Sequence, residues 1–272
     1  MIQPRKQFAQ HWLRSEKALS RIVAAAELNP HDRILEIGPG TGILTRQLLP
    51  LAQAVVAVEI DRDLCKALTQ KMGESENFLL LQGDFLNLDW RTLLEPFPAF
   101  QAPNKVVANI PYNITGPILE KLLGTIAQPS SHPFDQIVLL LQKEVADRLR
   151  ANPGSRNYGA LSVRVQYLAT CEFICDVPAK AFQPPPKVDS AVIRLRPHPP
   201  NPIAQDPHHL QTLVKMGFAS KRKMLRNNLK AVIEPTRLTQ LLEQLEVNPQ
   251  ARAEDLSVAQ WVVLSNQLSL QT

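Results

Sequence analysis

Short apolar runs alternate with amphipathic stretches over the first half of the chain. Five runs of four to seven residues, rich in Val, Ile and Leu, are separated by segments such as "GILTRQLL" and "RDLCKALTQKM". Runs of this length are typical of strands buried on both faces of a parallel sheet, with helices as the crossover connections. We therefore predict strands in "RILEIG" from residue 33, "AVVAVEI" from 54, "FLLLQGD" from 78, "KVVANI" from 105 and "QIVLLLQ" from 136.

The pattern changes after the fifth run. The runs "YLATCEFICDV" and "SAVIRLRP" have no convincing helix between them, so we predict an antiparallel pair that closes the sheet. The stretch "PHPPNPIAQDPHH" holds five prolines and is interpreted as a linker. Three helical segments follow, "LQTLVKMGFASKRKMLRNNLKAVI", "TRLTQLLEQL" and "SVAQWVVLSNQL", and Ser257 with Gln260 forms a capping box for the last. The predicted domains are residues 1–196 and 208–272, joined by a linker of residues 197–207.

Composition adds little to this picture. A hydrophobic fraction of 44% and a charged fraction of 20% are those of a globular protein, and the net charge of +5 is compatible with a polyanionic partner. Three cysteines without CxxC spacing predict free thiols in a reducing compartment, and the six histidines have no metal-ligand spacing, so no metal is expected. With no secretory core and no apolar run of membrane-spanning length, we expect a cytoplasmic protein, and a monomer.

The first predicted strand leads into a glycine-rich turn. Gly38, Gly40 and Gly42 are spaced G-x-G-x-G in "EIGPGTG", and the second strand ends in Glu59 about twenty residues on, where an acid can meet ribose hydroxyls. A dinucleotide fingerprint needs its third glycine at the position of Ile43. The sequence therefore favours a smaller nucleoside ligand.

A second acid, Asp84, follows the third strand and could accept from an adenine amino group. Together with Glu59 it would make the pocket acidic, which suits a cationic ligand such as S-adenosylmethionine and repels a diphosphate. The alternative interpretation is a tight turn for the glycines and a helix cap or solvated loop for each acid.

The tetrapeptide Asn109-Ile110-Pro111-Tyr112 lies at the carboxyl edge of the fourth strand. An adenine amino group is a poor nucleophile, but the Asn109 side-chain oxygen and a neighbouring main-chain carbonyl could hold its hydrogens and aim the nitrogen at a methyl group. Pro111 would stiffen this geometry, and the Tyr112 face could stack on a flipped base, worth about 1–3 kcal/mol. An Asn-Pro turn with a tyrosine in the core is the alternative.

One further segment bears on the target. Phe182 precedes three prolines in "FQPPPKVDSAVIRL", a rigid stretch that could hold its ring as a second plate against the base. The alternative is a core phenylalanine before a rigid loop.

Basic residues concentrate in "SKRKMLRNNLK". On the predicted helix Arg222, Arg226 and Lys230 recur at i, i+4, which indicates either phosphate contact or a solvated amphipathic face. Arg5 and Lys6 are weaker candidates for phosphate contact. The apolar stripe expected beside the three cations comprises Phe218, Leu225, Leu229 and Val232.

Nine stretches, taken in order, resemble the KsgA/RsmA family of ribosomal RNA adenine dimethyltransferases along nearly the whole chain. They are "RKQFAQHWL", "EIGPGTG", "VEIDRDL", "QGDFL", "NIPYNI", "LQKEVADRL", "YGALSV", "FQPPPKVDSAVIRL" and "KRKMLRNNL". The resemblance implies an α/β fold, a class I S-adenosylmethionine-dependent methyltransferase with a Rossmann-like, mostly parallel seven-stranded sheet and a small α-helical C-terminal domain. It also implies transfer of two methyl groups to each of two adjacent adenosines near the 3′ end of 16S ribosomal RNA, within the small ribosomal subunit or its precursor.

The resemblance also implies site residues. Asn109, Tyr112 and Phe182 match the residues that hold the target adenine. The family usually has Gly-Gln-Asn-Phe-Leu where this chain has Ala9-Gln10-His11-Trp12-Leu13, so His11 replaces an asparagine that contacts the cofactor, and imidazole can also donate or accept. Positions that match the family's cofactor-binding residues are His11, Leu13, Gly38, Gly40, Glu59, Asp84 and Asn109.

Three other functions are weighed against this one. The Erm-type resistance methyltransferases perform the same chemistry on large-subunit RNA and share the NxPY and Phe-Pro motifs, but "KRKMLRNNL" looks more like the small-subunit family. A ribosome assembly factor whose binding matters more than its catalysis is a second possibility. A DNA adenine methyltransferase would need a separate recognition domain, for which the segment after the sheet is short.

Overall fold

The computed structural model describes residues 3–5, 8 and 10–269 of the chain. These residues form two compact units, which are treated separately below. Unit 1 takes in residues up to 122, residues 132–146 and residues 172–197, and unit 2 takes in residues 123–131, residues 147–171 and the chain from 198 onward. Unit 2 therefore includes segments before the C-terminal region, and the division into domains 1–196 and 208–272 stays a prediction.

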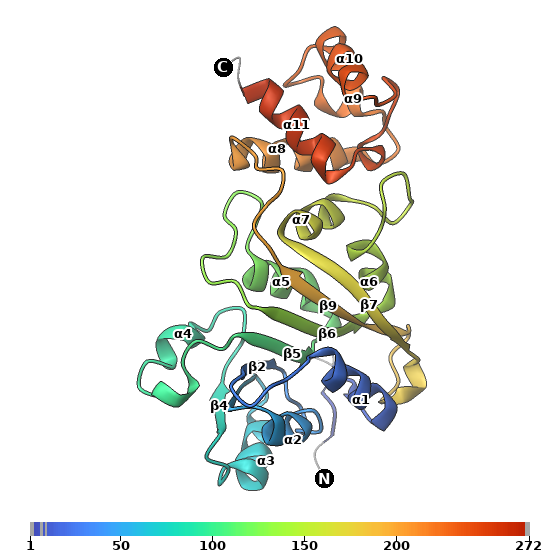
Figure 1. The fold of residues 1–272 in the computed structure, drawn as a ribbon. Helices are drawn as coiled ribbons and strands as arrows, with labels where there is room; N and C mark the ends of the chain where they lie inside the picture. The colour runs from blue at the N-terminus through green and yellow to red at the C-terminus, as the bar shows by residue number, and fades with distance from the viewer. Residues whose placement is uncertain (1–2, 6–7, 9, 270–272) are drawn as a thin grey trace. The chain divides into compact units, whose positions relative to one another are not determined.

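A seven-stranded sheet has the order β4-β3-β2-β5-β6-β9-β7 (Figure 1). A separate two-stranded ribbon pairs β1 with β8. Strands β2 to β6 pair in parallel, whereas β9 pairs antiparallel with β6. The strand bounds are β1 Trp12–Leu13, β2 Arg33–Ile37, β3 Ala54–Glu59, β4 Phe78–Gln82, β5 Lys105–Asn109, β6 Gln136–Gln142, β7 Ala169–Val177, β8 Phe182–Gln183 and β9 Ser190–Pro197.

The five predicted parallel strands are confirmed, and those inside the sheet are the most buried, whereas β4 at its edge is only partly buried. Every residue of β3 is buried, as are all but the last of β6. A strand covered on both faces needs apolar side chains at every position, which is why these runs do not alternate. The two later runs are also strands, and β9 and β7 are neighbours at the edge of the sheet, as predicted.

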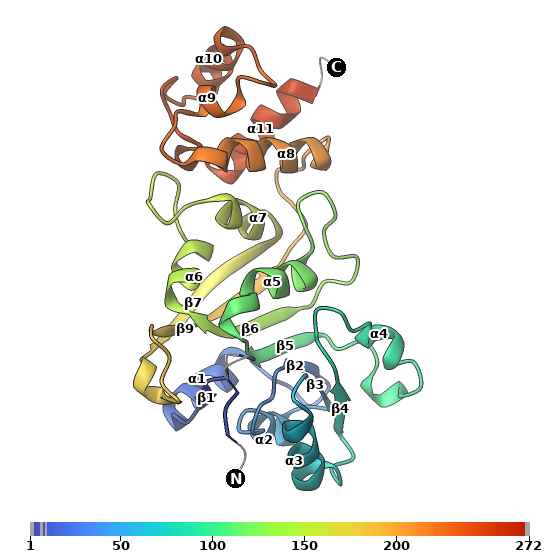
Figure 2. The same cartoon turned by 180° about the vertical axis from the view of Figure 1, so that it is seen from behind.

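Helices cover both faces of the sheet. Helix α1 lies in front of the sheet in Figure 1 and α5 lies in front of it in Figure 2. Helix α1 packs on β6 and β9, while α2 and α3 pack on β3. The helix bounds are α1 Glu16–Ala25, α2 Thr45–Leu48, α3 Arg62–Met72, α4 Trp90–Leu93, α5 Thr115–Leu123, α6 Lys143–Leu149, α7 Ala160–Leu168, α8 Pro207–Gly217, α9 Leu225–Leu229, α10 Pro235–Gln244 and α11 Val258–Ser269.

The order of the strands creates a crevice at the centre of the sheet. From β2 the chain proceeds to β3 and β4 on one side and then returns to place β5 on the other side of β2. The loops that follow β2 and β5 therefore leave the sheet in opposite directions. In open α/β sheets, ligands bind where this reversal occurs, at the carboxyl ends of the strands.

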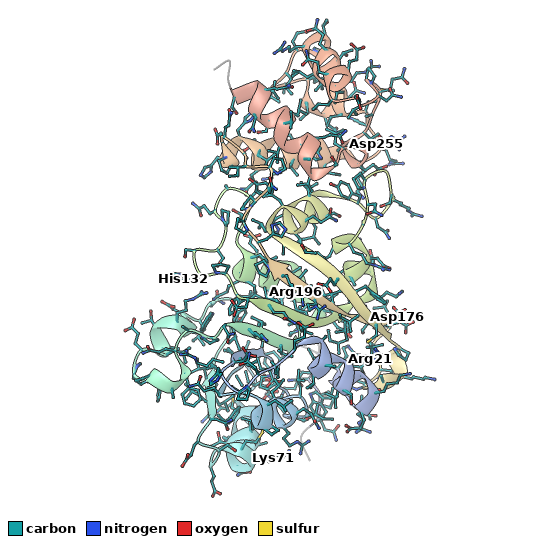
Figure 3. The ribbon with its side chains drawn as sticks, in the orientation of Figure 1. Arg21, Lys71, His132, Asp176, Arg196 and Asp255 are labelled. Carbon is teal, nitrogen blue, oxygen red and sulfur yellow. The ribbon has the colours of Figure 1, made fainter. Side chains whose placement is uncertain are left out.

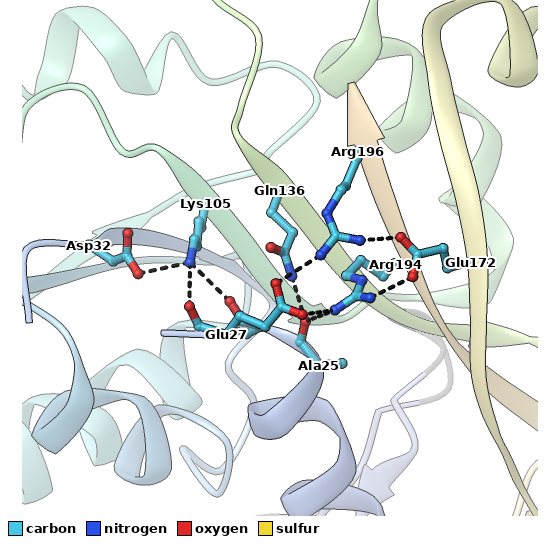
Figure 4. A network of polar contacts seen from close by, with 9 residues as sticks. Ala25, Glu27, Asp32, Lys105, Gln136, Glu172, Arg194 and Arg196 are labelled. Atoms are coloured by element: carbon cyan, nitrogen blue, oxygen red, sulfur yellow. Dashed lines mark hydrogen bonds and ion pairs between the residues drawn. The ribbon is translucent and has the colours of Figure 1, made fainter. Parts of the chain in front are cut away.

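A polar network fixes the end of α1 to the sheet (Figure 4). Arg194 on β9 donates to Glu27 and to Glu172 on β7, and Arg196 pairs with the same two acids. Nearby, the buried Lys105 ammonium lies 2.9 Å from Asp32 and donates to two main-chain carbonyls after α1. Each acid has a cationic partner, so this cluster has a structural role.

The long helix predicted from residue 210 to 233 is wrong. The structure has α8, a 3-10 turn over Phe218–Ser220 and the short helix α9. Two contacts explain the break. The Asn228 side chain donates to the main-chain carbonyl of Gly217 at 2.6 Å and to that of Ser220 at 3.1 Å. The backbone of Met224 is extended, with φ −58° and ψ 148°. The carbonyls at the end of α8 are thus capped by a side chain rather than by a continuing helix.

The rest of the C-terminal region follows the prediction more closely. Residues 198–206 form neither helix nor strand, and α10 and α11 fall on the two remaining predicted segments. Ser257 and Gln260 form the predicted capping box, with the Gln260 N–H donating to Ser257 Oγ at 3.2 Å and the Ser257 N–H to Gln260 Oε1 at 2.9 Å. Over the described ranges, no helix has the length and apolar character to cross a membrane. Cys65, Cys171 and Cys175 are free.

Gly217 should be indispensable for the packing of unit 2. A Cβ at this position would lie 2.4 Å from Cη2 of Trp261, whose side chain is fully buried in α11. We expect Gly217→Ala to destabilise the protein by about 1–3 kcal/mol through overpacking. Gly116→Ala is the matched control, because it lies within α5 and its added Cβ meets nothing within 4 Å, so it should be neutral or stabilising. Urea unfolding of both variants tests this, and equal midpoints would contradict it.

Candidate functional site

One cavity of unit 1 opens at the carboxyl ends of β2, β3, β4 and β5. It brings together residues that are far apart in the sequence, from the segment before β1 and from the loop after each of these four strands. The predicted site residues that line it are His11, Leu13, Gly38, Gly40, Glu59, Asp84, Asn109 and Tyr112.

The glycine turn after β2 has the backbone conformation that requires glycine. Gly38 and Gly40 have φ angles of +67° and +58°, a region that residues with a Cβ rarely adopt. The Gly38 N–H donates to the Val58 carbonyl at 2.9 Å and the Gly40 N–H donates to Glu59 Oε2 at 3.1 Å. The turn is therefore tied to the end of β3, where the predicted ribose-binding acid lies.

Glu59 is held in place by main-chain donors. Its second oxygen accepts the Asp61 N–H at 2.9 Å, and the residue is only 4% exposed. Burial raises the pKa of this carboxyl above its ordinary value. Each carboxylate oxygen has a further lone pair with which to accept from a ligand hydroxyl.

Asp84 follows β4, the strand next to β3, and the Gly83 N–H before it donates to the Glu59 carbonyl at 2.9 Å. Its Oδ1 accepts the Leu86 N–H at 3.0 Å and its Oδ2 accepts from the Asn87 side chain at 2.6 Å. These bonds form a turn, which is the alternative weighed for this acid, and they also fix the carboxylate at the cavity.

Two lining residues were missed by the sequence analysis. Glu36, the fourth residue of β2, is 1% exposed, and its Oε2 has no hydrogen-bond partner among the residues that the structure describes. Burial raises the pKa of Glu36 to about 8, and the nearby charge of Glu59 acts in the same direction. The sequence does contain a signal for Glu36, because this residue is an acid inside an apolar run predicted to be buried on both faces.

Trp12 is the other missed residue. Its indole covers the glycine turn, since a Cβ at Gly40 would lie 3.5 Å from Trp12 Cδ1. The buried indole N–H finds no acceptor in the described part of the chain. The cavity thus contains one unused buried donor and one unused buried carboxyl oxygen, in Glu36, which is unusual for a site without a polar ligand. No pattern in the sequence distinguished this tryptophan.

The target motif lies at the end of β5. Asn109 is its last residue, and its Nδ2 donates to the main-chain carbonyl of His11 at 3.4 Å, so that Oδ1 is left as an acceptor. Tyr112 is half-buried, its hydroxyl lies 2.5 Å from Ser190 Oγ, and burial raises the pKa of the phenol. The tyrosine is therefore fixed by its hydroxyl at the cavity wall rather than inside the core.

Phe182 is not part of this lining. It pairs with Leu13 in the β1–β8 ribbon, is 3% exposed and belongs to the apolar core of unit 1. These observations match the alternative of a core phenylalanine before a rigid loop. The ring that faces Tyr112 is instead that of His11, with centroids 5.8 Å apart.

The predicted RNA-binding cations are exposed in unit 2, but they do not share one helix. Arg222 lies in the turn before α9, Arg226 lies within α9 and Lys230 is its C-cap residue. Of the predicted apolar stripe, Val232 is 54% exposed, because the helix ends before it.

Of the two weaker candidates, Arg5 lies in unit 1, where it pairs with Asp61 at 3.2 Å and with Asp63. Lys6 lies outside the described residues. A group of three or more side chains able to hold a metal ion does not occur within the portion of the chain that the structure covers.

A family model and known protein sequences match this chain along nearly its whole length. The family model described as "Ribosomal RNA adenine dimethylase" matches residues 1–270. The chain is 70% identical, over 271 residues and 100% of both sequences, to "Ribosomal RNA small subunit methyltransferase A" of Trichormus variabilis. It is 59% identical over 275 residues to the protein of that name from Synechocystis sp., covering 98% of this chain and 97% of the relative.

Solved structures show the same fold. A dimethyladenosine transferase from Plasmodium falciparum is 27% identical with a TM-score of 0.76, covering 95% of this chain and 98% of that one. The 23S rRNA methyltransferase ErmE is 30% identical with a TM-score of 0.73, covering 95% of this chain and 99% of that one.

The raised pKa of Glu36 makes stability depend on pH. Folded Glu36 keeps its proton up to about pH 8, whereas the unfolded carboxyl has a pKa of 4.5, so unfolding releases a proton between these values. The free energy of unfolding should therefore fall with rising pH relative to Glu36→Gln, by up to about 1.4 kcal/mol per pH unit. Urea unfolding of both proteins at pH 5, 6.5 and 8 measures this. Parallel pH profiles would show that Glu36 is ionised in the folded protein.

Proposed function

The chain belongs to the ribosomal RNA adenine dimethylase family, and from this premise we propose that it methylates N6 of two adjacent adenosines near the 3′ end of 16S ribosomal RNA. The methyl donor is S-adenosylmethionine and the product is N6,N6-dimethyladenosine, formed during biogenesis of the small ribosomal subunit. The observation that carries the proposal is the placement of Asn109 and Tyr112 on the wall of the same cavity as Glu59 and the glycine turn.

The cavity residues fit S-adenosylmethionine. In this proposal Glu59 accepts from the ribose hydroxyls and Asp84 accepts from the adenine amino group. Glu36 Oε2 and the Trp12 indole N–H, both buried without partners among the described residues, can meet the ammonium and the carboxylate of the methionine end. When bound, this cofactor supplies an electrophilic methyl group on a sulfonium, and the acids of the cavity favour its positive charge.

Asn109 supplies the first acceptor for the target amine. Its Nδ2 is directed to the His11 carbonyl, which aims Oδ1 at the space where N6 must lie. Among main-chain carbonyls, that of Pro111 already receives the Ile114 N–H and the Thr115 hydroxyl, each at 3.4 Å. The Ile110 carbonyl has no such donor in the described structure, and we therefore assign it as the second acceptor.

Two acceptors and one stacking face are enough for this reaction. In the first of the two transfers they would hold both hydrogens of the amine and orient the nitrogen toward the methyl group, and such positioning lowers the barrier without a strong base. The proton leaves to water after the nitrogen has been alkylated. Pro111, with φ near −61°, keeps Tyr112 at a fixed distance from Asn109.

Labelled methyl transfer tests the substrate. The protein is incubated with S-adenosylmethionine and small ribosomal subunits that lack the modification, with large subunits and duplex DNA in parallel, and the labelled base is identified. We expect N6,N6-dimethyladenosine in small subunits alone. Label in large subunits would favour the specificity named for ErmE, whose structure shares the fold. Tight binding to small subunits without label would favour an assembly factor.

Asn109→Ala should nearly abolish turnover, because the amine loses its side-chain acceptor, while the affinity for S-adenosylhomocysteine stays within a few fold. Asn157→Ala, an exposed asparagine of unit 2, is the control and should be active. Rates with small subunits and calorimetric titration of the cofactor product provide the two readouts. Unchanged turnover of Asn109→Ala would overturn the assignment.

We further propose that Arg222, Arg226 and Lys230 bind RNA phosphates. Arg222→Glu with Arg226→Glu should weaken small-subunit binding and lower the slope of log affinity against log salt by about two, since each phosphate contact contributes about one. Lys66→Glu with Lys71→Glu makes the same change in charge on α3 (Figure 3 labels Lys71) and should have a smaller effect. An unaltered salt slope for the arginine pair would exclude these contacts.

A further inference from the structure

His11 is held by three contacts, each with a different part of the target site. Its ring Nδ1 lies 2.8 Å from the carbonyl oxygen of Pro184. The ring stacks with Tyr112, with the centroids 5.8 Å apart and the planes 21° from parallel. Its main-chain carbonyl accepts the Asn109 amide at 3.4 Å. His11 thus connects the tetrapeptide after β5 to the proline-rich segment after β8.

The contact with Pro184 determines the tautomer of the imidazole. A carbonyl oxygen only accepts, so Nδ1 must carry the proton and donate it. In the neutral ring Nε2 is then unprotonated. Since the acceptor is main chain in a segment of three prolines, the ring plane has little freedom.

The contact with Tyr112 determines where a base can stack. An aromatic plate inserted between two rings needs about 7 Å between them, twice the van der Waals separation of carbon atoms. The distance of 5.8 Å is too small for this. The Tyr112 hydroxyl also lies 2.5 Å from Ser190 Oγ. The tyrosine is therefore restrained at its hydroxyl by Ser190 and on one face of its ring by His11. A base that stacks on Tyr112 would therefore have to use the other face.

We propose that His11 is a positioning residue for the target adenine, which it serves by fixing the face of Tyr112 on which that base stacks. The inference rests on the proposed function and deepens it. It also departs from the role implied by resemblance, in which the asparagine usual at this position contacts the cofactor. His11 lines the shared cavity, so both roles are sterically accessible and experiment can separate them.

The two roles differ in what a substitution changes. A ring that only restrains Tyr112 contributes to the alignment of N6 with the methyl group, so its loss lowers kcat and leaves cofactor affinity alone. A cofactor contact contributes to the affinity for S-adenosylhomocysteine. A phenylalanine keeps the stacking surface and loses the bond to Pro184, and it should therefore rescue most of the activity if stacking is what matters.

The variants are His11→Asn, which restores the residue usual in the family, and His11→Phe. The control is His31→Asn, on an exposed turn. We expect His11→Asn to lower kcat on unmodified small subunits at least tenfold, with the affinity for S-adenosylhomocysteine within twofold. His11→Phe should stay within about threefold of the unsubstituted kcat. A fivefold or greater loss of cofactor affinity in His11→Asn, an unchanged kcat, or a His11→Phe as slow as His11→Asn would each overturn the inference.

A measurement independent of activity completes the test. Nitrogen NMR of the histidine rings, with the His11 signal identified by its loss in His11→Asn, should show the proton on Nδ1. An Nδ1 without a proton, as in the tautomer protonated on Nε2 alone, would contradict the contact with Pro184, and with it the inference. Lack of methyl transfer by the unsubstituted protein would count against the proposed function alone, because the tautomer and the cofactor affinities are measured without turnover.

Discussion

The site depends on the placement of β5 between β2 and β6. Parallel pairing of β5 with both neighbours puts Asn109 at the same edge of the sheet as the glycine turn, although the two are separated by about seventy residues. Because the chain reverses its progress across the sheet at this point, the two loops diverge and leave a crevice. They remain close at its base, where a Cβ on Gly38 would lie 3.9 Å from the Pro111 ring. The proposed cofactor and target residues therefore line one cavity because of strand order.

Electrostatics then give this crevice its ligand preference. Glu36 and Glu59 are buried acids whose pKa values are raised, chiefly by their burial. A buried carboxyl oxygen without a partner, such as Glu36 Oε2, is costly, and the proposed ligand with its sulfonium and ammonium would remove part of that cost. The same argument excludes a diphosphate, as the missing third glycine does. The arrangement shows how a nucleotide-type fold can be adapted to a cationic nucleoside.

What the sequence could predict follows from the range of the interactions involved. The parallel strands were predictable because burial on both faces, complete in β3 and nearly complete in β6, makes such runs almost continuously apolar, and the edge strand β4 has the same apolar character. The glycine turn and the motif after β5 were predictable because they follow those strands directly.

The position of Phe182 was not predictable, since its burial arises from pairing of β8 with β1, about 170 residues away. The long C-terminal helix failed for a similar reason: the cap that Asn228 places on Gly217 and Ser220 is a contact made only after the chain has turned. His11 contacts Pro184 and Tyr112, and Trp12 covers Gly40. The surroundings of both residues thus also come from segments far away in the sequence.

The proposed function requires one cavity to present a methyl group and an adenine amine to each other. A crystal structure with S-adenosylhomocysteine and a short RNA containing the target adenosine tests this requirement. We expect the cofactor ribose on Glu59 and the adenine stacked on Tyr112, with N6 about 2.7–3.2 Å from both Asn109 Oδ1 and the Ile110 carbonyl. An adenosine bound elsewhere, or with N6 turned away from both oxygens, would contradict it.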